Sequence, residues 1–133
     1  MSEIDWKALR SNAIETMRKA YAPYSRFPVG AAALTGAGGI VRGCNVENVS
    51  YGLGLCAETV LIGNHQTAGG GRLLAVSVSD SRGSVLLPCG RCRQVLYEFG
   101  GADLLVDHPD GPVRLAALLP EAFGPDDLAA GQR

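Results

Sequence analysis

The sequence lacks the features that mark three common classes of protein. It has no basic surplus, with 12 Lys and Arg against 13 Asp and Glu and a formal net charge of -1. A protein that binds phosphate backbones carries such a surplus, so we expect no nucleic acid as a partner. No apolar run approaches the roughly 18–20 residues that cross a bilayer, so we expect no membrane association. The first ten residues contain acidic side chains and no apolar stretch typical of a secretory signal, so we expect a cytoplasmic, reducing location.

Charged side chains are also scarce, whereas glycine is abundant. Hydrophobic residues make up 47% of the 133 residues and charged residues 19%. This composition argues against disorder and predicts one domain over residues 1–133. The thinly charged surface indicates a homo-oligomer that covers part of it. The 18 glycines follow no period and indicate tight turns or close approaches of the backbone.

Four cysteines are the first candidates for chemistry: Cys44, Cys56, Cys89 and Cys92. A reducing compartment disfavours a framework of disulfides. The C-x-x-C spacing of Cys89 and Cys92 leaves three interpretations open, namely a redox dithiol, half of a closed structural zinc site, and part of an open catalytic zinc site.

The residues around these cysteines predict that they lie at the starts of two helices. Pro88, which favours the first turn of a helix, precedes the pair, and residues 91–99 have apolar side chains at helical spacing. Residues 56–65 have the same character, with Cys56 first. Helix N-termini favour thiolates, so two such starts can present their sulfurs to one cation.

Glu58, two residues after Cys56, favours the catalytic interpretation. A glutamate in a first helical turn is commonly a partner of the helix dipole or a capping residue. A hydrolytic zinc site, however, needs a group that takes the proton from water and passes it on. A closed structural site has no use for a carboxylate beside the metal.

The combination of C-A-E at residues 56–58 with P-C-x-x-C at residues 88–92 resembles the signature of zinc-dependent nucleoside and nucleobase deaminases. Cysteine rather than histidine at the first position points to the small cytidine deaminases within that superfamily. Further blocks resemble this family in the same order along the chain: residues 21–33, 43–51, 55–58, 88–96 and 118–123.

The resemblance implies a function and a site. It implies hydrolytic deamination of cytidine and 2′-deoxycytidine in pyrimidine salvage, with zinc hydroxide as the nucleophile and Glu58 as the proton shuttle. Cys56, Cys89 and Cys92 would bind one Zn²⁺ per subunit. The resemblance also implies a homotetramer with shared active sites, in which Phe123 reaches a neighbouring subunit. The implied substrate-binding residues are Phe27, Asn45, Glu47, Tyr51, Ala57 and Phe123.

Asn45 and Glu47 also support a nucleoside substrate by their chemistry. Alternate residues of an extended segment face the same side, and an amide with a carboxylate suits neutral hydroxyl groups and repels phosphate. The two histidines of the chain, His65 and His108, lack zinc-like spacing to another ligand and are expected in other roles.

One residue departs from the family pattern. Members often carry arginine directly after C-A-E, where it donates hydrogen bonds to the zinc thiolates, and here that residue is Thr59. Three thiolates on Zn²⁺ sum to a charge of -1, so some group must draw charge off the sulfurs. Arg91 is our candidate, with Arg93 as its rival.

Other functions remain open at this point. A structural zinc module would use Cys44 as a fourth ligand and would not need Glu58. A thiol oxidoreductase would form a metal-free disulfide between Cys89 and Cys92. A related deaminase that acts on a nucleoside antibiotic is the alternative within the superfamily.

The order of the predicted elements indicates an α/β fold, a three-layer α/β/α arrangement with a five-stranded mixed sheet. The first two strands form an antiparallel hairpin, and the later strands alternate with the two zinc helices. The tail from residue 124 to residue 133 is expected to be polar and loose. The expected helices cover residues 5–21, 56–65 and 91–99, and the expected strands cover residues 29–34, 40–45, 73–79, 104–107 and 112–114.

Overall fold

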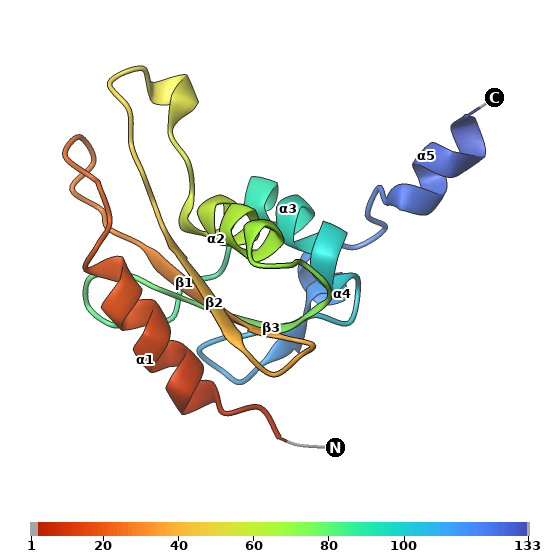
Figure 1. Ribbon diagram of the computed structural model, residues 1–133, viewed down its shortest axis with the longest axis horizontal. Helices are drawn as coiled ribbons and strands as arrows, with labels where there is room; N and C mark the ends of the chain where they lie inside the picture. The colour runs from red at the N-terminus through yellow and green to blue at the C-terminus, as the bar shows by residue number, and fades with distance from the viewer. Residues whose placement is uncertain (1–2, 133) are drawn as a thin grey trace.

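The computed structural model describes residues 3–132 and contains one five-stranded mixed sheet (Figure 1). The strands lie in the order β2-β1-β3-β4-β5, and only β3 and β4 form a parallel pair. Across residues 3–132, no helix is both long and apolar enough to cross a membrane. The strands are β1 (Gly30–Thr35), β2 (Ile40–Cys44), β3 (Leu73–Ser79), β4 (Leu105–Val106) and β5 (Val113–Arg114), and the helices are α1 (Trp6–Met17), the 3-10 turn η1 (Tyr51–Leu53), α2 (Ala57–Thr67), α3 (Gly90–Gly100), α4 (Leu115–Leu118) and α5 (Pro125–Gly131).

The sheet separates two layers of helices, as predicted. Figure 1 shows α1 on one side of the sheet, with α2 and α3 on the other. Successive residues of β1 face opposite sides because the side-chain period of a strand is two. Ala32 packs in the core on the α1 side with Leu9, whereas Ala31 and Ala33 pack in the core on the α2 side with Leu61. The small side chains of β1 let both layers approach the middle of the sheet.

Two glycines fix how closely the helices lie against the sheet. A Cβ atom at Gly30 would overlap the backbone of α1 at Ala13 and Met17. A Cβ atom at Gly43 would overlap the backbone of α2 at Leu61. The absence of these atoms therefore sets the position of α2, the helix that begins beside Cys56, against β2.

The two predicted relations between strands are confirmed. β1 and β2 form the antiparallel hairpin, and β3 runs parallel to β4. The first helix is shorter than predicted, because α1 ends at Met17 rather than at Tyr21. The Tyr21 N–H donates to the carbonyl of Asn45, and the Glu47 N–H donates to the carbonyl of Tyr21. Tyr21 therefore pairs with the segment after β2 and cannot continue the helix.

The C-terminal segment forms a short helix where we expected a loose tail. Pro125 occupies its first turn, where a fixed backbone angle favours a helix, and the Gly124 N–H donates to the Asp127 carboxylate at 2.8 Å. None of the residues of α5 is buried, and α5 projects away from the sheet and its helices (Figure 1). It therefore adds nothing to the core.

Candidate metal and catalytic site

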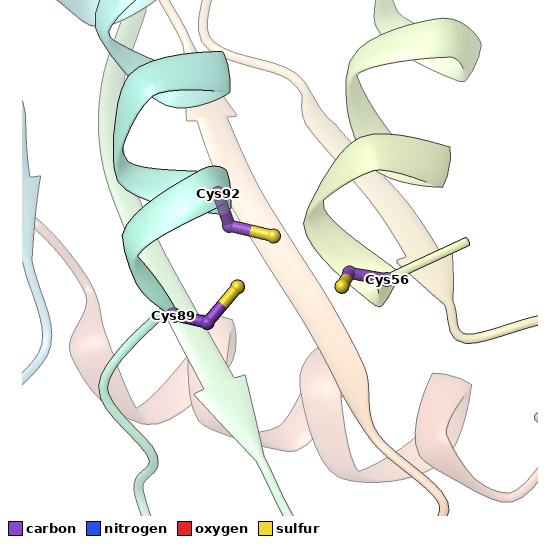
Figure 2. A group of neighbouring side chains, drawn as sticks. All are labelled: Cys56, Cys89 and Cys92. Atoms are coloured by element: carbon purple, nitrogen blue, oxygen red, sulfur yellow. The ribbon is translucent and has the colours of Figure 1, made fainter. Parts of the chain in front are cut away.

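Three cysteine side chains point toward one another between α2 and α3 (Figure 2). The sulfur atoms of Cys56, Cys89 and Cys92 all lie within 4.8 Å of one another. Sulfurs bound at 2.3 Å to one tetrahedral Zn²⁺ would lie about 3.8 Å apart, so the donor type and the spacing both fit zinc. Cys44 does not belong to this cluster within residues 3–132, so the fourth sulfur of a closed site is missing from it. Three thiols with one open position match the ligand number of catalytic zinc sites.

The topology explains why distant cysteines meet. β2 and β3 are both antiparallel to β1, so the segments that follow them leave the sheet at the same edge. Each segment ends at a helix whose N-cap is a cysteine with extended backbone angles, Cys56 before α2 and Cys89 before α3. Cys92 lies in the first turn of α3. The unpaired N–H groups and the dipoles of both helices therefore favour negative charge on the sulfurs.

Burial alone would keep two of these thiols protonated. It raises the pKa of Cys56 and, more strongly, the pKa of Cys92. A thiol binds metal as the thiolate, so zinc binding must displace these protons.

Glu58 is buried beside the thiols. Its residue is only 4% exposed, and it lines a cavity of about 300 Å³ together with Cys56 and Cys89. Burial raises the pKa of the Glu58 carboxyl, although its own backbone amide and the Cys92 thiol oppose the shift. A carboxyl group whose pKa is raised holds its proton more readily and is better suited to accept and return one.

The walls of this cavity come from several parts of the chain. Three further predicted residues line it, namely Phe27, Asn45 and Ala57. Sequence reasoning missed five others, which are mostly apolar: Ser25, Val29, Val78, Leu86 and Leu87. The sequence contains signals for three of these five residues. Ser25 lies in the segment 21–33, which also contains Phe27, and Leu86 and Leu87 directly precede the P-C-x-x-C motif. The apolar walls favour a flat ring over a charged ligand.

Asn45 fixes the loop that carries Phe27. Its Nδ2 donates to the carbonyl of Phe27 at 3.0 Å, and its Oδ1 accepts from the N–H of Val29 at 2.9 Å. An amide has two N–H groups and two lone pairs on oxygen, so one of each stays available for a ligand.

Glu47 fixes the tip of the same loop. One carboxylate oxygen accepts from the N–H groups of Tyr24 at 2.9 Å and Ser25 at 3.1 Å, and the other accepts from the Ser25 hydroxyl. The Ser25 hydroxyl, followed by the backbone donors, holds the pKa of Glu47 below its usual range. Glu47 therefore carries a negative charge beside the cavity at neutral pH.

Three predicted substrate contacts, Glu47, Tyr51 and Phe123, lie outside the zinc cavity of their own chain. Tyr51 is 81% exposed and lines an adjacent pocket of about 270 Å³ together with Glu47. Phe123 is 60% exposed and lies near Gln94 on the outer side of α3. The structure thus places Glu47 and Tyr51 beside the site, leaves Phe123 apart, and brings together the other predicted residues: Cys56, Cys89, Cys92, Ala57, Glu58, Phe27 and Asn45.

The structure distinguishes the two arginines considered as donors to the zinc thiolates in place of the family's arginine at Thr59. The Thr59 hydroxyl is buried and has no hydrogen-bond partner among residues 3–132. Arg93 is engaged elsewhere, because its guanidinium donates to the carbonyls of Pro88 and Leu118. Arg91 is exposed. Of the two arginines, only Arg91 therefore remains a candidate donor to the thiolates.

Comparisons with known proteins agree with this arrangement. The family profile described as "Cytidine and deoxycytidylate deaminase zinc-binding region" matches residues 4–107. A protein named cytidine deaminase from Mycobacterium tuberculosis is 59% identical over 133 residues, which are 100% of both chains. The crystal structure of cytidine deaminase from the same organism superposes with a TM-score of 0.90 at 61% identity and covers 92% of this chain and 99% of that one. The crystal structure of cytidine deaminase from Mycobacterium leprae gives 0.88 at 48% identity and covers 90% and 100%.

Proposed function

This chain belongs to the cytidine deaminase family, and we propose that it hydrolyses both cytidine and 2′-deoxycytidine to the corresponding uridine and ammonia. The enzyme is a zinc-dependent hydrolase. The observation that carries the proposal is the meeting of three thiols within 4.8 Å of one another, at the starts of α2 and α3, with the buried Glu58 in the same cavity. Beside an open three-thiol site, a carboxylate can transfer protons during hydrolysis, whereas a closed structural site needs no such group.

Cys56, Cys89 and Cys92 would hold the metal, and Glu58 would move the protons. Zinc, when bound there, supplies a Lewis acid that allows water to ionise near neutral pH and attack C4 of the pyrimidine. Glu58 accepts the proton of that water and donates it to ring N3, which makes C4 more electrophilic. Glu58 next takes the remaining proton from the new C4 hydroxyl group and passes it to the 4-amino group; the C4–N4 bond breaks as the C4 carbonyl forms, and ammonia leaves. One carboxyl group serves both transfers because water enters and ammonia leaves on the same face of the ring.

Phe27, Ala57, Asn45 and Glu47 would bind the nucleoside. Phe27 supplies an aromatic surface for the pyrimidine ring, and the backbone beside Ala57 contacts it. After fixing the loop, both Asn45 and Glu47 still have unused lone pairs on oxygen, and Asn45 also has an unused N–H group. These groups can form hydrogen bonds with the sugar hydroxyls. The charge on Glu47 repels a 5′-phosphate, which favours a nucleoside over a nucleotide.

We further propose a homotetramer with shared active sites. The chain exposes several large apolar side chains, among them Phe27 and Tyr51 at the site and Phe123 apart from it. A surface of this kind is typical of an interface. Phe123 is exposed and does not line the cavity of its own chain, so the proposal assigns Phe123 to the cavity of a neighbouring subunit. The reaction places the protein in pyrimidine salvage, and a metal site made of free thiols suits the reducing cytoplasm.

A single assay with three substrates tests this proposal. The zinc content of the purified protein is measured, and the ultraviolet absorbance of cytidine, 2′-deoxycytidine and deoxycytidylate is followed on the same sample. We expect about one zinc per chain, turnover of both nucleosides, and a much slower reaction with the nucleotide. Zinc-loaded protein that turns over neither nucleoside would refute the proposal. Equal turnover of deoxycytidylate would refute the role of Glu47 in excluding phosphate.

A further inference from the structure

The second turn of α3 makes contacts that the reaction itself does not explain. Arg93 follows the zinc-site residue Cys92 directly, and its guanidinium contacts two distant parts of the backbone. Its Nε donates to the carbonyl of Pro88 at 2.8 Å, and its Nη1 donates to the carbonyl of Leu118 at 3.0 Å. One side chain therefore joins the residue before Cys89 to the end of α4.

The contact with Pro88 follows from the geometry of a helix start. Cys89 is the N-cap of α3, so Pro88 precedes the cap and Arg93 is the fourth helical residue. Side chains at the fourth position turn back toward the residue before the cap, where many helices place a pair of apolar groups. Pro88 is fully buried, and a buried carbonyl needs a partner. The guanidinium of Arg93 supplies that partner and fixes the peptide that leads into Cys89.

The contact with Leu118 holds the segment that leads to Phe123. Leu118 is the last residue of α4, and the last carbonyls of a helix lack partners within the helix. Arg93 caps this end. The neighbouring side chain, Gln94, donates from Nε2 to the carbonyl of Phe123 at 2.8 Å. Residues 118–123 are therefore held at both ends by two consecutive residues of α3.

We propose that Arg93 is a positioning residue that fixes the zinc-binding loop at Pro88 and the segment carrying Phe123 in one arrangement, with Gln94 completing the second attachment. The geometry of Cys89 and the placement of Phe123 then both depend on Arg93. The half of the inference that concerns Phe123 rests on the proposed function, which gives Phe123 a place in a substrate pocket.

The test uses the zinc-loaded enzyme and two independent measurements. The first is the rate at which zinc passes to a chromophoric chelator, and the second is the pair of constants kcat and KM for cytidine. We expect Arg93→Ala to release zinc roughly tenfold faster, because losing a partner that orients a metal ligand weakens metal binding by about 10–100-fold. Arg93→Ala should also raise KM. Gln94→Ala should raise KM with kcat nearly unchanged and release zinc at the wild-type rate.

Two further variants separate positioning from stability. Leu96→Val weakens the buried face of the same helix and leaves the Pro88 and Leu118 carbonyls paired, so zinc release should stay at the wild-type rate below the melting temperature. Arg93→Lys keeps one charged donor, so its rate of zinc release should lie between those of wild type and Arg93→Ala. The lysine variant also serves as the test if Arg93→Ala does not fold.

Three results would overturn the proposal. The first is wild-type zinc release from Arg93→Ala, or from Arg93→Lys if the alanine variant does not fold. The second is equally fast release from Leu96→Val, which would show that loosening of the helix suffices. The third is fast release from Gln94→Ala, which would show that the two attachments are not distinct. Zinc release needs no substrate, so its outcome stands even if cytidine is not turned over.

Discussion

Removal of Arg10 should destabilise the fold, because it leaves a buried carboxylate without its cation. Asp107 follows β4, and its side chain is fully buried between α1 and the sheet. Arg10 on α1 donates to both of its oxygens, at 2.7 Å from Nε and 2.8 Å from Nη2, and the Ser77 hydroxyl on β3 donates at 2.8 Å. This network ties α1 to β3 and to the end of β4.

The expected loss of unfolding free energy depends on whether a variant leaves an unpaired charge in the interior. Breaking a buried pair by removing one partner costs about 3–5 kcal/mol in the free energy of unfolding. The Arg10 side chain is 46% exposed, so water already weakens the pair, and we expect Arg10→Ala to cost about 3 kcal/mol. Asp107→Asn leaves an arginine that can turn to solvent, so it should cost about 1–2 kcal/mol. The double variant should be more stable than Arg10→Ala, because it no longer buries an unpaired charge.

The destabilisation caused by Arg10→Ala should decrease as the pH falls into the acid range. Burial would raise the pKa of Asp107, but the hydrogen bonds from Arg10 and Ser77 outweigh it and hold the pKa below its usual range. A carboxyl group whose folded pKa is lowered stabilises the fold above its unfolded pKa of about 3.9, and this contribution is lost as the pH falls through the folded value. The difference between wild type and Arg10→Ala should therefore be largest near neutral pH and should shrink below about pH 4.

Urea unfolding followed by the fluorescence of Trp6, the single tryptophan, measures these differences. Arg114→Ala is the matched control, because it breaks an exposed ion pair with Asp103 and should change stability by less than about 1 kcal/mol. An Arg10→Ala variant as stable as this control at neutral pH would refute the reasoning. A difference that persists unchanged into acid would refute the role assigned to the Asp107 charge.

Three further predictions concern the metal and the helix that carries its ligand. Gly43→Ala should displace α2 at Leu61, lower stability by about 1–3 kcal/mol and reduce the zinc content; a thermal melt and metal analysis that match wild type would contradict this close approach. Cys44→Ala should keep its zinc and Cys92→Ala should lose it, because Cys92 belongs to the three-thiol cluster and Cys44 does not; loss of metal from Cys44→Ala would instead support a four-sulfur site. Removal of zinc by a chelator should lower the melting temperature, and added zinc should restore it; an unchanged melting temperature would mean that the metal does not bind the folded chain.

The sequence predicted the parts of the site that depend on local chemistry. Proline before Cys89 and helical spacing after Cys56 are local signals, and the structure has both helix starts there. The hairpin and the parallel pair of strands also follow from the order of elements and from turn residues. Glu58 could be singled out because it is two residues from a candidate ligand.

Contacts between distant segments could not be predicted in the same way. Nothing near Tyr21 in the chain shows that its backbone pairs with Asn45, so the predicted first helix was too long. Arg93 was considered as a donor to the thiolates, but its actual partners include Leu118, which the fold alone brings near. The partner of a long polar side chain depends on tertiary packing, which periodicity and spacing do not encode.

The most direct test of the account compares Glu58→Gln with wild type on the same two properties, zinc content and turnover of cytidine. Glu15→Gln, the same substitution at an exposed position of α1, is the control. The account predicts that Glu58→Gln keeps about one zinc per chain and loses several powers of ten in kcat, while the control keeps both properties. A Glu58→Gln enzyme with full zinc and a kcat within about tenfold of wild type would contradict the assignment of Glu58 as the proton shuttle, because general acid–base catalysis alone contributes about 10²–10⁴-fold.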